Sequence, residues 1–125
     1  MKRILVAALL LAACHGDVAG PHAGSLAVTM SGSGAGDGAL VFTVSGGAVS
    51  AVHAAAGYQI AVQNDDAGTH VILVGPIAAG VVATVDVPDL ALAASYVATV
   101  DQAADGASFV LRDPAAYRLA LAVAP

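Results

Sequence analysis

From Ser25 onward, apolar residues alternate with small or polar residues in short runs that end at Gly, Asn, Asp or Pro. A period of two places successive side chains on opposite faces of a β-strand. In the run GALVFTVS, residues 38–45, this puts Leu40, Phe42 and Val44 on one face. Repeated runs of this length with turn residues between them predict an antiparallel β protein.

The pattern predicts strands at residues 25–31, 38–45, 48–54, 57–63, 69–75, 80–87, 95–104, 108–112 and 117–123. Eight or nine short strands at this spacing favour an antiparallel β-sandwich, with a small barrel as the alternative. Gly46-Gly47 indicates a two-residue hairpin between the second and third strands. The run at residues 69–75 is apolar on both faces, so we expect a central strand. Residues 90–94 fit one short helical turn.

Composition favours one domain with little helix and argues against nucleic-acid binding. A chain of 125 residues fits one domain. It has no Glu and no Lys after Lys2, residues that normally cover exposed helix faces. Losing Lys2 and Arg3 with the N-terminal segment would take the net charge from −5 to −7. A chain this acidic lacks the basic surface that binds phosphates, so we expect no nucleic-acid partner.

The first thirteen residues are arranged like a signal peptide. Met1-Lys2-Arg3 is a short basic start, and residues 4–13 are uncharged and rich in Leu and Ala. As a helix this apolar run would span about 15 Å, roughly half of a bilayer core. The sequence therefore favours a cleaved segment over a transmembrane anchor.

Leu11-Ala12-Ala13-Cys14 resembles the lipobox of bacterial lipoproteins, in which a leucine and two small residues precede an invariant cysteine. The resemblance implies cleavage before Cys14 and attachment of a diacylglyceryl group to its thiol, often with acylation of the new amino terminus. Several acyl chains anchor a protein stably to a membrane. Two alternatives stay open: an ordinary secretory signal cut near Ala13 or Cys14, and a reactive or metal-binding thiol.

These features divide the chain into a signal peptide (residues 1–13), a lipidated flexible tether (residues 14–24) and a β-sandwich domain (residues 25–125). The tether HGDVAGPHAG is rich in Gly and has few bulky residues. The expected location is the bacterial cell envelope. His15, rather than Asp, follows Cys14, and the lipoprotein resemblance implies that this favours the outer membrane in a Gram-negative host.

The run GALVFTVSGGAVSAV, followed later by GVVATVDV, is similar to cohesin-type and other immunoglobulin-like modules of bacterial surface proteins. This resemblance covers residues 25–123. It implies an immunoglobulin-like or cohesin-like sandwich and transfers no binding residue.

The sequence offers little for catalysis. No G-x-S-x-G motif is present, and Gly32-Ser33-Gly34 lies in a predicted loop without a following helix. His53 and His70 are the available bases, but each is better explained as a half-exposed strand residue. We therefore expect no enzymatic activity and no cofactor.

Metal and glycan sites have only weak candidates. Asp65, Asp66, Asp101 and Asp105 carry carboxylates that suit calcium, although none matches the calcium loop D-x-[DN]-x-[DN]-G and Asp is also common in turns. Glycan binding usually uses exposed aromatic platforms, for which Tyr96 and Tyr117 are the candidates; both also fit the edge of a core.

Taken together, the residues predict a membrane-anchored extracytoplasmic lipoprotein with a non-catalytic β-sandwich that binds an envelope protein or a glycan, or has a structural role. The alternative is a calcium-dependent adhesion or carbohydrate-binding module.

Overall fold

The computed structural model describes residues 20–32 and 37–124. The strands of this part of the chain are β1 (Gly24–Gly32), β2 (Asp37–Ser45), β3 (Ala51–Ala54), β4 (Gln59–Asp65), β5 (Gly68–Ile77), β6 (Gly80–Val87), β7 (Val97–Asp105), β8 (Leu111–Arg112) and β9 (Tyr117–Val123). The helical segments within the same ranges are two 3₁₀ turns, η3 (Leu90–Ser95) and η4 (Pro114–Ala116). No helix in these ranges is long and apolar enough to cross a membrane.

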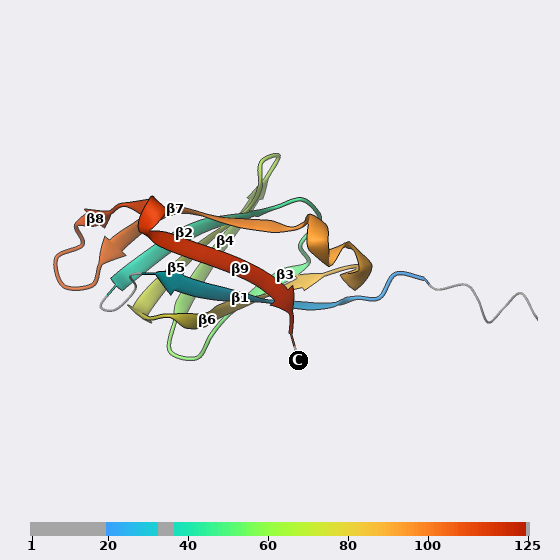
Figure 1. Cartoon of the computed structure of the whole chain (residues 1–125), viewed down its shortest axis with the longest axis horizontal. Helices are drawn as coiled ribbons and strands as arrows, with labels where there is room; N and C mark the ends of the chain where they lie inside the picture. The colour runs from blue at the N-terminus through green and yellow to red at the C-terminus, as the bar shows by residue number, and fades with distance from the viewer. Residues whose placement is uncertain (1–19, 33–36, 125) are drawn as a thin grey trace, which may run out of the picture.

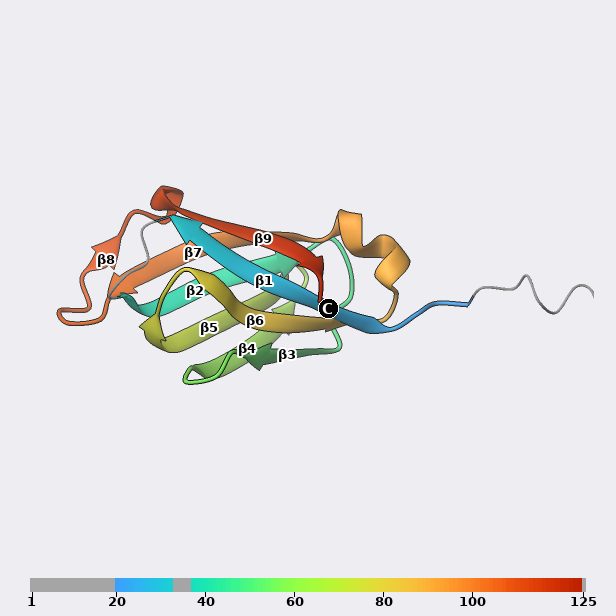
Figure 2. The same cartoon turned by 60° about the horizontal axis from the view of Figure 1, so that its bottom comes forward.

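The strands form two antiparallel sheets that pack face to face (Figures 1 and 2). One sheet has the order β3-β6-β1-β9 and the other has the order β4-β5-β2-β7-β8. The prediction of an antiparallel β-sandwich is confirmed, with nine strands. The alternative of a closed barrel is wrong, because the described strands belong to two separate sheets.

The core lies between the four central strands, β1 and β6 in one sheet and β2 and β5 in the other. Alternate residues of these strands point inward and are fully buried, as the period of two predicts. The largest buried side chains are Phe42, Leu26, Met30, Leu40, Leu73 and Ile77. Valines fill most of the remaining space, which compensates for the small number of aromatic residues.

The predicted hairpin at Gly46-Gly47 is wrong. After β2 the chain crosses to the other sheet, where β3 pairs with β6, whereas β2 pairs with β5 and β7. The two glycines instead allow a close approach: Gly46 has a φ of +99° and abuts the backbone of Ser95, and a Cβ at Gly47 would come within 2.7 Å of the Tyr96 ring. The tyrosine hydroxyl donates to the Ala48 carbonyl at 2.6 Å.

Two further predictions need adjustment. β5 is central, as expected, because β4 and β2 flank it. Its outer face is nevertheless open, and Ile72 and Val74 are 44% and 45% exposed. The strand predicted at residues 108–112 shortens to Leu111–Arg112. The helical turn predicted at residues 90–94 is confirmed as η3, whose N-cap, Asp89, accepts from the Ala91 amide.

Candidate functional site

The residues that carry the lipobox pattern, Cys14 included, lie outside the described ranges. The described chain begins at Gly20 and runs into β1. His22 already contacts the sandwich, because its carbonyl accepts from the Leu90 amide at 2.7 Å. The chain therefore enters the domain beside η3, two residues earlier than β1 begins.

A row of polar side chains crosses the outer face of the five-stranded sheet. His70 on β5 contacts Asp65 through Nε2 at 2.8 Å and the Thr43 hydroxyl through Nδ1 at 2.9 Å. The Thr43 hydroxyl donates to Asp101 at 2.5 Å. The row thus links β4, β5, β2 and β7. The side chains can contact one another across the strands because Thr43 and His70 are direct partners in the β2–β5 register.

This row resembles a hydroxyl–imidazole–carboxylate triad, but its hydrogen bonds run the wrong way for nucleophilic catalysis. The Thr43 proton is used in the bond to the Asp101 carboxylate, which only accepts. The Thr43 hydroxyl therefore has no second proton to give to His70, as a nucleophile would give its proton to the base of a triad. The four side chains form one hydrogen-bonded network across the sheet surface.

His53 lies in the other sheet and has its own partners. Its Nε2 contacts Asp86 at 2.9 Å, and Asp86 also accepts from the Ser25 hydroxyl at 2.6 Å. These two hydrogen bonds, that of Ser25 first, hold the pKa of the Asp86 carboxyl below its usual value. Because His53 and His70 are on different sheets, they do not form one catalytic centre.

Asp105 organises the connection between β7 and β8. Its carboxylate accepts from the Ser108 hydroxyl at 2.8 Å, from the Ser108 amide at 2.9 Å and from Arg112 at 2.7 Å. The Ser108 hydroxyl first, and then Arg112, keep the pKa of Asp105 well below its usual range. The turn held in this way brings Phe109 into a positive φ of 56°, which is uncommon for a bulky residue.

Arg112 also approaches a buried carboxylate at the start of β2. Its Nε lies 3.2 Å from Asp37 Oδ1, and the Asp37 side chain is only 1% exposed. A buried carboxylate needs such compensation. Arg112 therefore ties the β7–β8 end to β2, and its bond to Asp105 raises its own pKa further.

The four aspartates proposed as weak calcium ligands do not converge. Asp65 and Asp101 lie in the polar row, on either side of His70 and Thr43. Asp66 follows Asp65 in the β4–β5 turn, and Asp105 binds Arg112. Residues 20–32 and 37–124 contain no group of three or more His, Cys, Asp or Glu side chains that could hold a metal ion.

Neither tyrosine offers a glycan platform, because Tyr96 and Tyr117 are 6% and 5% exposed. The exposed aromatic residue is instead Phe109, which forms a run of exposed apolar residues with Val110 and Leu111. The pattern at residues 108–112 predicted a strand there and so gave no sign of this exposed run. The motif Asp105-Gly106-Ala107-Ser108 was the available signal, since an aspartate can accept hydrogen bonds from the amides two and three residues on.

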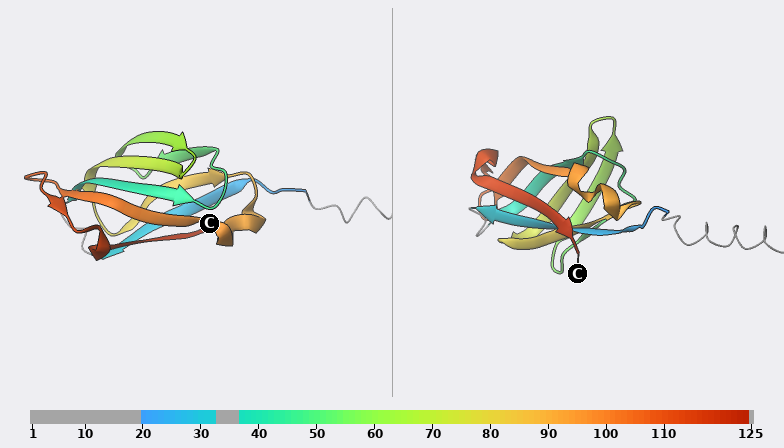
Figure 3. Two further views of the ribbon diagram at one scale, coloured as in Figure 1. Left: turned by 90° about the horizontal axis from the view of Figure 1, so that it is seen from above. Right: turned by 45° about the vertical axis from the view of Figure 1, so that its right-hand side comes forward.

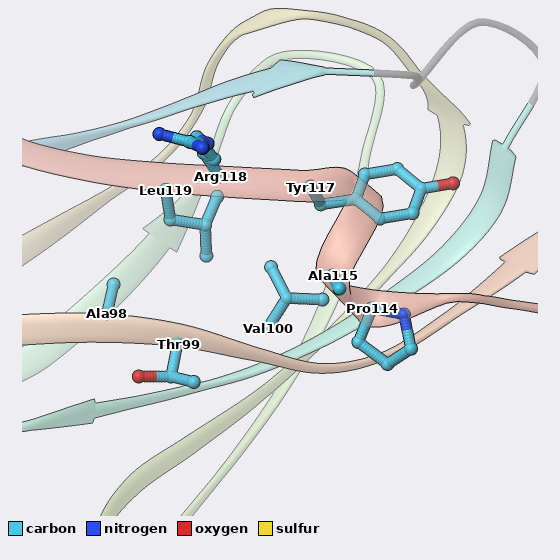
Figure 4. A pocket seen from close by; sticks show the side chains of 8 residues that line it. All are labelled: Ala98, Thr99, Val100, Pro114, Ala115, Tyr117, Arg118 and Leu119. Atoms are coloured by element: carbon cyan, nitrogen blue, oxygen red, sulfur yellow. The ribbon is translucent and has the colours of Figure 1, made fainter.

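A groove with a volume of about 470 Å³ lies between β7 and β9 (Figure 4). Val100 and Leu119 point toward each other across it, whereas Arg118 points away. Its other lining residues are Ala98, Thr99, Pro114, Ala115 and Tyr117. The lining is mostly apolar and holds no pair of acid and base groups, so its chemistry suits apolar contact.

In comparisons with known proteins, no protein-family model, no curated protein and no solved structure matches the chain.

Proposed function

We propose that this protein is a bacterial lipoprotein whose β-sandwich serves as a non-catalytic binding or structural module in the cell envelope. The observation that carries the proposal is the sequence Leu11-Ala12-Ala13-Cys14, which follows a basic start and an apolar run of signal-peptide length. In this proposal the thiol of Cys14 carries the lipid that holds the protein at the membrane. A Gram-negative host would place it at the outer membrane, because His15 follows the cysteine.

The arrangement of the sandwich is consistent with display from a membrane. The chain enters the domain near η3, and the β7–β8 end lies at the opposite end of the molecule (Figure 1). The β7–β8 end carries Phe109, Val110 and Leu111, which are 68%, 63% and 66% exposed. A lipid at Cys14 would leave this apolar end facing away from the anchoring membrane. A contiguous exposed apolar surface favours contact with a partner, here an envelope protein or a glycan.

The anchor is tested by replacing Cys14 with serine in the full chain. We expect Cys14→Ser to block lipid attachment and cleavage, so that intact mass shows a precursor retaining residues 1–13. The wild-type mass should correspond to a chain starting at Cys14 plus a diacylglyceryl group. His15→Ser is the matched control, because it changes the neighbouring residue and leaves the lipobox intact.

Two outcomes would contradict the proposed anchor. One is a wild-type chain without any acyl mass. The other is a Cys14→Ser chain that is processed normally and stays in the membrane fraction as the wild type does.

A further inference from the structure

β4 is a free edge of the five-stranded sheet that lacks the usual protection against pairing. Of the described strands, β5 alone pairs with it. Natural edge strands are normally protected by charges, prolines, bulges or short length. β4 has seven residues, carries no charge between Gln59 and Asn64, contains no proline and has no bulge in its register with β5.

The other edges of the sandwich differ from β4. β3 and β8 are only four and two residues long. β9 has the same length as β4, but it carries Arg118 and packs against both β7 and η3, whereas β4 contacts β3 besides its pairing partner β5. The β4–β5 hairpin instead projects from the body of the sandwich (Figures 1 and 3). All residues of β4 except Ile60 are exposed, and Val62, an inward-facing residue, is 43% exposed.

The register of the hairpin identifies the backbone groups on the free side. Asp65 pairs with Gly68 across the two-residue loop, and such a loop closes on a hydrogen-bonded pair. Bonded and non-bonded pairs alternate along an antiparallel ladder. Ile60, Val62 and Asn64 therefore direct their N–H and C=O groups away from β5, toward solvent.

The sequence of this edge is complementary to itself. In Gln59-Ile60-Ala61-Val62-Gln63, the residue types on either side of the alanine match. If two such strands pair antiparallel about Ala61, each Ile60 lies opposite Val62 of the second copy, and each Gln59 lies opposite Gln63. Apolar pairs and amide pairs stabilise cross-strand contacts, and no like charges meet.

We propose that β4 is an interface between two copies of this chain, paired antiparallel about a two-fold axis at Ala61. The pairing joins two five-stranded sheets into one continuous sheet and satisfies the outward groups of Ile60 and Val62 in both copies. The same register brings Asp65 opposite Gly57 of the second copy. That position is open, because no heavy atom lies within 4 Å of the place where a Cβ of Gly57 would stand.

Edge pairing buries less surface than the roughly 1,600 Å² of a standard interface, so we expect a dimer that dissociates at about micromolar concentrations.

Cysteine crosslinking is the direct test. In this register Ala61 lies opposite Ala61 of the second copy. The two residues form a non-hydrogen-bonded pair with Cα atoms about 4.5 Å apart, a distance that permits a disulfide between cysteines. The full chain carrying Ala61→Cys should give a reducible dimer with an added thiol oxidant. Ala120→Cys on the exposed face of β9 is the matched control. The wild-type chain shows how much crosslinking occurs through Cys14 alone.

Charge at the same position gives a second test that does not depend on a thiol. Ala61→Lys and Ala61→Glu each place like charges at the axis, so we expect each variant alone to be monomeric in analytical ultracentrifugation of the detergent-solubilised full chain. An equimolar mixture should recover the dimer, because the two charges then attract. Ala61 is exposed, so circular dichroism should show the same fold for both variants.

The proposal is overturned if wild type stays monomeric at about 500 µM, a concentration well above the range expected for such an interface. It is also overturned if Ala61→Cys crosslinks no more than Ala120→Cys, if either charged variant dimerises as wild type does, or if the mixture stays monomeric.

Discussion

The middle of the sandwich and its β4 edge are built from the same kind of sequence and have different surroundings. In β2, Leu40, Phe42 and Val44 alternate with smaller residues and are fully buried. In β4, Ile60 and Val62 alternate in the same way, yet Val62 is nearly half exposed. β2 has a strand on each side and a second sheet below it, whereas β4 has one neighbouring strand. Position in the sheet therefore decides whether an alternating pattern yields core or interface.

This difference shows where stability and recognition lie in the molecule. The inward residues of β1, β2, β5 and β6 account for most of the fully buried side chains. Six of the ten exposed large apolar residues lie in two places, on β4 and β5 (Val62, Ile72, Val74) and at the β7–β8 end (Phe109, Val110, Leu111). Apolar surface removed from water stabilises the fold at roughly 25 cal/mol per Å². Apolar surface left exposed does not contribute in this way and is available to a partner.

The largest expected effect is the difference in the free energy of unfolding between two truncations, one in the core and one on the β4 edge. Phe42→Ala removes a fully buried ring between the sheets and should lower the free energy of unfolding by about 3–5 kcal/mol. Val62→Ala removes a partly exposed side chain and should cost below about 1 kcal/mol. Urea unfolding of both variants at the same protein concentration measures the difference. Equal costs for the two substitutions would contradict the division into core and margin.

A smaller effect should come from acidification, which acts on the polar clusters outside the core. Hydrogen bonds lower the pKa values of Asp65, Asp86 and Asp105 in the folded chain. Each carboxylate therefore stabilises the fold above its unfolded pKa, near 3.9, and this contribution is lost as the pH falls further through the folded pKa. We therefore expect the thermal unfolding midpoint to decrease once the pH is lowered below about 4.

Asp105→Asn identifies the part of this acid sensitivity that belongs to the β7–β8 end. The amide does not titrate, so the variant should start with a lower midpoint at pH 7 and lose less on acidification than wild type. An unchanged pH dependence in this variant would show that Asp105 does not contribute.

Local patterns in the sequence predicted the strands because alternation reports directly on burial between two sheets. The bounds of β1, β2, β6 and β9 agree with the predicted runs to within about one residue. The Gly46-Gly47 hairpin failed for a different reason. Two glycines permit a tight turn but do not choose the partner strand, and here they accommodate Ser95 and Tyr96 from a distant part of the chain.

The polar clusters could not be predicted in the same way. The row through Asp65, His70, Thr43 and Asp101 depends on the register of four strands, and no spacing in the sequence encodes that register. The ion pair of Asp37 and Arg112 likewise joins residues far apart in the chain. The symmetric run at Gln59–Gln63 was visible in the sequence, but its meaning depends on the position of β4 at a sheet edge.

Amide hydrogen exchange of the full chain, followed residue by residue at two protein concentrations, tests most directly whether the β4 edge is open in one copy and closed by another. In dilute protein, the amides of Ile60, Val62 and Asn64 should exchange rapidly, while those of the buried strands β2 and β5 stay protected. In concentrated protein, the amides of Ile60 and Val62 should slow, and those of Ala61 and Gln63, which face β5, should change little. Exchange at Ile60 and Val62 that is independent of concentration would contradict the account.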